Sequence, residues 1–240
     1  MAFKELISPT LKELFVKEIE SMILSKELKI GEKLPPEREL AEKMNVSQAV
    51  INGGIIELAN KGFLKVIPRK GTYVADYKHE GTFEILQSIL EYNGGHFDPC
   101  LLNSLLETRQ CIECSAAALA AQKASLEDIR KLRAKLDELE HTQGVKQQSK
   151  VATDFYRELH IASGNIIYPL IFHAFEYVYL SMLEAMYKRG FLGEEINLLH
   201  KLTDLIEQKK PKEAADCVSE LVKWVRNTMQ KSFTPGQRII

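Results

Sequence analysis

The sequence is poor in several features that mark large classes of protein. Four cysteines among 240 residues do not make a disulfide framework. No apolar run is long enough to span a membrane, because Glu176 and Glu184 interrupt the most apolar stretch, residues 166–186. No charged-then-apolar leader opens the chain. Neither sign of charge dominates, since 32 Lys and Arg face 33 Asp and Glu. We therefore expect a cytoplasmic protein with no membrane partner and no general coat of positive charge.

The remaining composition is that of a globular protein with two domains. Hydrophobic residues make up 45% of the chain and charged residues 27%, which excludes disorder and fibrous repeats. The length suits two cores better than one. Short helical and strand-like patterns occupy the first part, and helical periodicity follows. We predict one domain over residues 1–77, a second over 78–240, and a short linker at 77–80.

Caps and turns in the first part outline a winged helix-turn-helix. Ser8-Pro9 predicts the start of a helix that runs to about residue 26. Two further helices are expected over about 36–44 and 48–60, the last ended by Gly62. Two short strands, 63–67 and 72–75, come next. Two helices joined by a tight turn and followed by a hairpin form such a module.

The second part predicts an antiparallel bundle of about seven helices, so the fold class is mainly α. Breaks at glycine, asparagine and proline separate helices at roughly 81–93, 98–122, 125–142, 147–163, 167–189, 193–209 and 211–231.

The third helix carries polar side chains where a DNA-reading helix needs them. At 100° per residue, Val50, Ile51, Gly54 and Leu58 should turn to the core. Gln48 and Asn52 fall on the opposite side, and either amide can pair with adenine in the major groove. An ordinary solvated helix face is an equally valid interpretation of this pattern.

The predicted hairpin has a basic tip. Residues 58–75 contain four basic residues and no acid, and Arg69, Lys70 and Gly71 lie at the turn. A thin basic tip with glycine can enter the minor groove or lie along phosphates. The alternative is an ordinary basic turn.

Residues 31–42 (GEKLPPERELAE), Val46-Ser47, residues 58–64 and residues 71–74 (GTYV) closely resemble the winged-helix domain of the GntR family of bacterial transcription regulators. The resemblance implies that Arg38 contacts DNA, and that Lys70 and Gly71 approach the minor groove. Ser47, which caps the reading helix, is included among the candidate DNA-binding residues.

This chain departs from the family pattern in its reading helix. The family usually has arginine at the positions of Gln48 and Asn52, and Glu-Ala where this chain has Gly53-Gly54. Since arginine is the usual reader of guanine, we expect an operator with A·T pairs opposite Gln48 or Asn52. Gly54 should permit close helix packing, whereas Gly53 has no evident structural need. The same departures leave open a weakened or vestigial DNA module.

The second part resembles the FCD effector domain of the FadR-type branch of this family, through Arg109-x-x-Ile112-Glu113 and residues 154–169. The resemblance implies an all-helical dimerisation domain that binds an anionic small molecule, of the carboxylate or acyl-CoA type. Arg109, Tyr156, Tyr168 and His200 are the candidate effector-binding residues. A structural pair between Arg109 and Glu113, one turn away, is equally compatible, and the tyrosines are also typical of a core.

The family often holds its ligand through a metal bound by Asp-x-x-x-His and two later histidines. By the resemblance, these positions fall on Ala152, Tyr156, His200 and Val222. One imidazole does not hold a divalent ion. We therefore predict a metal-free pocket and no cofactor.

These observations predict a ligand-responsive transcription regulator that binds a roughly palindromic double-stranded operator as a homodimer. The alternative is a small-molecule binding or interaction protein with a weakened DNA module. No nucleophile–base set, phosphate loop or complete metal site is visible in the sequence, so an enzyme is not expected. The effector, the operator and the sign of regulation stay open.

Overall fold

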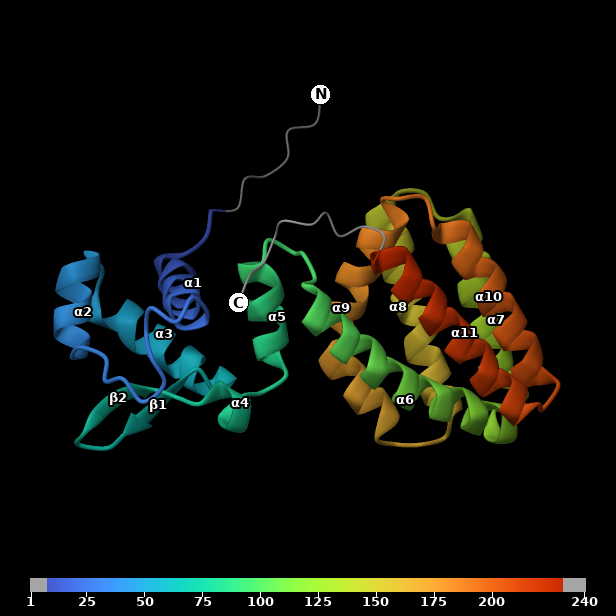
Figure 1. Cartoon of the computed structure of the whole chain (residues 1–240), viewed down its shortest axis with the longest axis horizontal. Helices are drawn as coiled ribbons and strands as arrows, with labels where there is room; N and C mark the ends of the chain where they lie inside the picture. The colour runs from blue at the N-terminus through green and yellow to red at the C-terminus, as the bar shows by residue number, and fades with distance from the viewer. Residues whose placement is uncertain (1–7, 231–240) are drawn as a thin grey trace, which may run out of the picture. The chain divides into compact units, whose positions relative to one another are not determined.

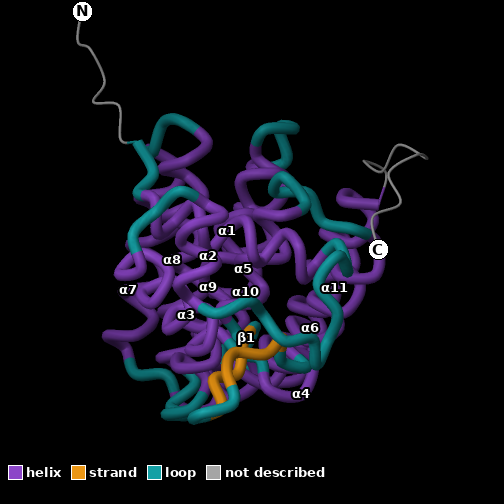
Figure 2. The backbone as a smooth tube through the Cα atoms, turned by 90° about the vertical axis from the view of Figure 1, so that its left-hand side faces the viewer, coloured by secondary structure: helices purple, strands orange, loops and turns teal. Residues whose placement is uncertain are grey.

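The computed structural model describes residues 8–230 (Figure 1). Helices dominate this part of the chain, and two short strands form one small hairpin (Figure 2). The chain divides into two compact units, one ending at His96 and the other beginning at Phe97. None of the described helices is both long and apolar enough to cross a membrane.

The first unit is the predicted winged helix-turn-helix. Its elements are α1 (Leu11–Leu24), α2 (Glu37–Met44), α3 (Gln48–Lys61), β1 (Leu64–Ile67), β2 (Gly71–Val74), α4 (Tyr77–Glu80) and α5 (Glu84–Tyr92). Helix α1 begins two residues later than the Ser8-Pro9 signal predicts, because Thr10 and Glu13 form a capping box there. Ser47 caps α3 as predicted, and Gly62 ends α3 at φ 89°.

The hairpin forms the wing, and it has a partner that the sequence did not reveal. Leu64 pairs with Val74 and Ile67 with Gly71, so the strands are antiparallel and in register. The extended segment before α2 is hydrogen-bonded to β2: Leu34 N donates to Thr72 O and Val74 N donates to Glu32 O, both at 2.9 Å. The wing is thereby fixed to the chain that enters α2.

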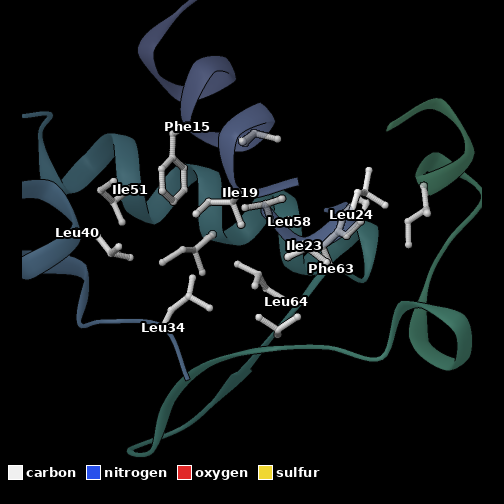
Figure 3. Packing of buried hydrophobic residues seen from close by; sticks show 14 of the residues in the cluster. Phe15, Ile19, Ile23, Leu24, Leu34, Leu40, Ile51, Leu58, Phe63 and Leu64 are labelled. Atoms are coloured by element: carbon white, nitrogen blue, oxygen red, sulfur yellow. The ribbon is translucent and has the colours of Figure 1, made fainter. Parts of the chain in front are cut away.

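One hydrophobic core holds the first unit together (Figure 3). Phe15 of α1 points between the helices toward Ile51 of α3. Gly54 is buried beneath Phe15, and a Cβ added there would overlap the Phe15 ring. The prediction of which α3 residues face the core is confirmed for Ile51, Gly54 and Leu58. Val50 is only half-buried, whereas Ile55, absent from that prediction, is buried.

Helix α5 groups with the winged unit, although the sequence suggested a boundary after residue 77. Ile85 joins the core of the first unit, and Ser88 donates to Glu20 of α1 at 2.9 Å. The expected linker contains the one-turn helix α4, capped by Asp76. By contacts, residues 78–96 therefore belong with the first unit.

The second unit is a bundle of six described helices, the other helix of the predicted seven being α5. They are α6 (Pro99–Lys123), α7 (Leu126–His141), α8 (Val145–Ala162), α9 (Tyr168–Tyr187), α10 (Leu192–Glu207) and α11 (Pro211–Gln230). Helix α6 packs on α11 and α8, and α9 packs on α8. The predicted end of the last helix, Lys231, lies outside the described residues.

Candidate nucleic-acid interface and effector pocket

The N-terminal half of α3 presents the amides that the sequence analysis selected. Gln48 and Asn52 are exposed one turn apart, with Ala49 beside them. Ser47 Oγ accepts a hydrogen bond from the backbone N–H of Val50 at 3.3 Å, which fixes the first turn. This end of α3 therefore offers short polar side chains to a major groove.

Helix α2 places two charged side chains at the same surface. The Asn52 amide nitrogen donates to both carboxylate oxygens of Glu37, each at 3.4 Å. Arg38 Nε donates to Glu42 Oε1 at 3.1 Å, and the Arg38 side chain is 81% exposed. An exposed pair of this kind contributes little to stability, so Arg38 can exchange Glu42 for a phosphate.

Two of the four basic residues in segment 58–75 have acidic partners. Lys61 is paired with Glu20 at 2.9 Å and Lys65 with Glu80 at 3.0 Å, acids contributed by α1 and α4. Within residues 8–230, Arg69 and Lys70 take part in no ion pair and are exposed. The tip turns through left-handed backbone at Arg69 (φ 63°) and Gly71 (φ 118°).

Arg109 lies inside the bundle between two tyrosine rings. Its guanidinium carbon is 4.7 Å from the Tyr156 ring centroid and 5.0 Å from that of Tyr179. Nε donates to Glu113 Oε1 at 2.8 Å, so the structural pair exists, and the Tyr179 hydroxyl donates to the same oxygen. Burial opposes the charge on Arg109, but the Glu113 carboxylate raises the pKa of Arg109 well above its usual value. Arg109 therefore stays cationic.

The pair does not satisfy the whole guanidinium. The two terminal nitrogens of Arg109, Nη1 and Nη2, are buried and have no hydrogen-bond partner among the described residues. A buried charged donor without a partner is costly, so this arrangement suits an additional acceptor.

A second buried carboxyl group lies near Arg109. The Tyr156 hydroxyl donates to Glu195 Oε1 at 2.5 Å, and the Tyr187 hydroxyl is also near this carboxylate. Burial raises the pKa of Glu195, although Arg109 opposes this shift. The protonated form of Glu195 is thereby favoured more than in water.

A small cavity of about 30 Å³ opens beside Arg109, between α6 and α9. His160 is also in its lining and is held by its Nδ1, 2.7 Å from Tyr156 O. Burial lowers the pKa of His160, so the neutral imidazole is favoured. The remaining lining is almost entirely apolar: Leu105, Leu106, Thr108, Ile112, Ile171, Phe172, Phe175, Val178, Tyr179 and Met182. The pocket is thus an apolar crevice with one buried cation.

The other candidate effector residues lie at different distances from this crevice. Tyr156 stacks on Arg109, but it is not in the cavity lining. The Tyr168 ring lies 6.4 Å from the His160 ring, next to the crevice. His200 is on another surface, where its Nε2 is 2.6 Å from Glu140 Oε1. Sequence reasoning missed Glu195 and did not connect Tyr179 or His160 with Arg109, because no spacing in the chain links these residues to it.

The four positions of the family's metal pattern do not fit a metal ion here. Ala152 and Val222 are buried and have no donor atoms, Tyr156 is hydrogen-bonded to Glu195, and His200 is paired with Glu140. Within residues 8–230, no three His, Cys, Asp or Glu side chains cluster as metal ligands would.

Comparison with known proteins agrees with both units. Residues 11–74 match the profile of the bacterial regulatory proteins of the gntR family, and residues 104–223 match the FCD domain. The chain belongs to the GntR family. This GntR regulator therefore combines a DNA-binding domain with an effector domain, and it acts as a ligand-responsive DNA-binding transcription regulator.

Its relatives are regulators rather than enzymes. The chain is 26% identical over 186 residues to the regulator Mce2R of Mycobacterium tuberculosis, covering 78% of this chain and 77% of that protein. It is 28% identical over 192 residues to the fatty acid metabolism regulator of Proteus mirabilis, covering 79% and 78%. The solved structure of Lar from Listeria monocytogenes has the same fold, with a TM-score of 0.66 at 18% identity, covering 94% of this chain and 99% of that one.

Proposed function

We propose that this regulator binds a roughly palindromic operator as a homodimer and that an anionic effector held by Arg109 controls that binding. The observation that carries the effector part is the pair of buried guanidinium nitrogens without partners. Arginine matches the planar geometry of a carboxylate, which can accept from both nitrogens at once. The hydrogen bond from Arg109 Nε to Glu113 is kept and orients the guanidinium.

The lining of the crevice supports an effector with an apolar body. Beside Arg109 and His160, nearly every lining residue is aliphatic or aromatic. This environment favours a carboxylate with an apolar tail, free or as part of a larger acyl compound. The present volume of about 30 Å³ is too small for a long apolar tail, so we expect α6 and α9 to separate when the effector enters.

The DNA part of the proposal rests on Arg38, Gln48, Asn52 and the wing tip. All are exposed, and α3 is capped and packed in spite of its two glycines. These features favour a working DNA module over a vestigial one. A single reading helix contacts few base pairs, so two copies on half-sites about 10 base pairs apart would supply the specificity. The protein then has a form that binds DNA and a form that does not, and the effector must bind one of these forms better than the other.

The effector proposal is tested by thermal unfolding with straight-chain carboxylates of increasing length. We expect the wild-type melting temperature to rise with the concentration and tail length of the ligand. Arg109→Gln leaves Glu113 buried without a cation, so Arg109→Gln/Glu113→Gln, which removes both charges together, is the test variant. Arg157→Gln, which removes a half-exposed arginine of α8, is the matched control. Equal shifts in wild type and the double variant would disprove the role of Arg109.

The dimer and the operator are tested together. Sedimentation of the full chain should give twice the chain mass, and selection from random DNA should return inverted repeats rich in A·T pairs opposite α3. A monomer bound to single half-sites would contradict this part of the proposal.

A further inference from the structure

We propose that Glu37 is a positioning residue for base reading: it orients the Asn52 amide so that the amide pairs with adenine. This inference rests on the DNA-binding role above and names one determinant of its specificity. Glu37 is the first residue of α2, and α2 packs on α3. Neither side chain is buried, so their pairing serves no core.

The chemistry of the pair fixes which end of the amide faces outward. A carboxylate only accepts hydrogen bonds, so the nitrogen of Asn52, rather than its oxygen, must face Glu37. The nitrogen is 3.4 Å from each carboxylate oxygen, as expected when one N–H points between them. The second N–H and Oδ1 lie on the other side of the amide and stay available.

This orientation matches one base better than the others. Adenine presents an N7 acceptor and an N6 donor in the major groove, which are complementary to one N–H and one amide oxygen. Guanine presents two acceptors, N7 and O6, at the same edge. Asn52 Oδ1 would oppose guanine O6, and the nearby Glu37 carboxylate adds repulsion. The pair therefore selects adenine and rejects guanine.

Gln48 supplies an internal comparison on the same helix. No acid is hydrogen-bonded to Gln48 among the described residues. Gln48 therefore has no carboxylate in the described part of the chain to orient its amide, and the base that it meets should not depend on Glu37. A change confined to the base opposite Asn52 would distinguish positioning from a general effect on α3.

The experiment is selection of DNA from a random library by the full-length protein, followed by affinity measurement on operators that differ at one base pair. Wild type should prefer adenine opposite Asn52 by about tenfold or more. Glu37→Ala should reduce this preference to about twofold, while binding to non-specific DNA stays equal or tightens because a negative charge is removed. Glu37→Gln, whose amide oxygen can still accept, should restore most of the preference.

Three further variants make the result decisive. Asn52→Ala should lose the same preference, and Glu37→Ala/Asn52→Ala should behave as Asn52→Ala alone. Glu39→Ala, which removes another exposed acid of α2 that is paired with Lys43 at 2.8 Å, should leave the preference unchanged. The inference is overturned if Glu37→Ala keeps the full adenine preference, or if Glu39→Ala lowers it equally. If the wild-type protein binds all DNA sequences equally, the DNA-reading role itself is overturned, and this inference with it.

Discussion

Gly53 and Gly54 are neighbours in α3, yet their surroundings are opposite. A Cβ on Gly54 would overlap the Phe15 ring of α1, so glycine is required for these helices to pack. A Cβ on Gly53 would lie 3.4 Å from Lys12 Cδ, an ordinary contact with a flexible side chain. One glycine serves the core, and the other only lowers the helix propensity of α3.

We therefore predict opposite effects for two identical substitutions. Gly54→Ala should destabilise the winged unit by about 1–3 kcal/mol through overpacking. Gly53→Ala should stabilise it by up to about 1 kcal/mol, because alanine favours the helix. Urea unfolding followed by circular dichroism measures both, and each variant is the control for the other. Destabilisation by Gly53→Ala would show that its position has a steric requirement.

His160 should make the bundle less stable in mild acid. Burial lowers its pKa in the folded protein below the usual 6.5. The unfolded chain then binds a proton that the folded chain does not, so the free energy of unfolding falls as the pH drops below about 6.5. The loss is at most about 1.4 kcal/mol per pH unit.

The measurement compares wild type with His160→Gln by urea unfolding between pH 7.5 and 5.5. The wild type should lose more stability over this range than the variant. Glu195, whose raised pKa acts in the opposite direction, is present in both proteins and cancels in the comparison. An identical pH dependence in the two proteins would contradict the prediction.

Among single residues, those with a local signal were predictable from the sequence. Ser47, Gln48 and Asn52 follow from capping and helical periodicity, and Arg109 stands out as a cation in an almost uncharged segment. The partner Glu113, one turn away, was predictable, but Tyr179 and Glu195 were not, because they come from α9 and α10 and meet Arg109 only through the packing of the bundle.

At the scale of elements, the wing combines basic residues that have an acidic partner with basic residues that have none in the described part of the chain. Lys65 is held by Glu80 of α4, whereas Lys70 at the tip takes part in no ion pair within residues 8–230. The number of basic residues in the wing sequence therefore overstates the positive charge that the wing presents without an acidic partner.

Salt dependence should separate the two lysines. Lys70→Ala should reduce the slope of log affinity against log salt by about 0.9 for each phosphate that the lysine neutralises, and by twice that for a bound dimer. Lys65→Ala, the matched control on the same wing, should change the slope little. Equal slopes for wild type and Lys70→Ala would mean that the wing tip does not touch phosphates.

Helices were the most predictable elements, since periodicity, caps and glycine stops are all local. The pairing of Glu32 and Leu34 with β2 was not predictable, because their hydrogen bonds go to Thr72 and Val74, about forty residues away. The assignment of α5 to the first unit was not predictable either, because it depends on distant contacts such as the hydrogen bond from Ser88 to Glu20 of α1.

At the scale of the whole molecule, two separate cores indicate two cooperative units. The first centres on Phe15, Ile51 and Leu58. The second is built on leucines of α6 and α7, such as Leu106 and Leu136. Chains with two such units commonly depart from two-state unfolding.

The only tryptophan allows this to be tested, since Trp224 lies in α11 and packs on Phe191. Its fluorescence should report unfolding of the bundle alone, whereas circular dichroism reports both units. We expect the two urea transitions not to coincide, and Gly54→Ala to move the circular dichroism transition but not the fluorescence one. Coincident transitions that shift together would mean that the cores unfold as one.

The narrowness of the crevice beside Arg109 has a consequence for time rather than affinity. For the effector proposed above, a space of about 30 Å³ is too small for the apolar tail, so binding should wait for α9 to move away from α6. The observed association rate should then level off at high effector concentration, at the rate of that opening. A regulator of this kind would respond with a built-in delay, and pulses of effector shorter than the opening time would pass without effect.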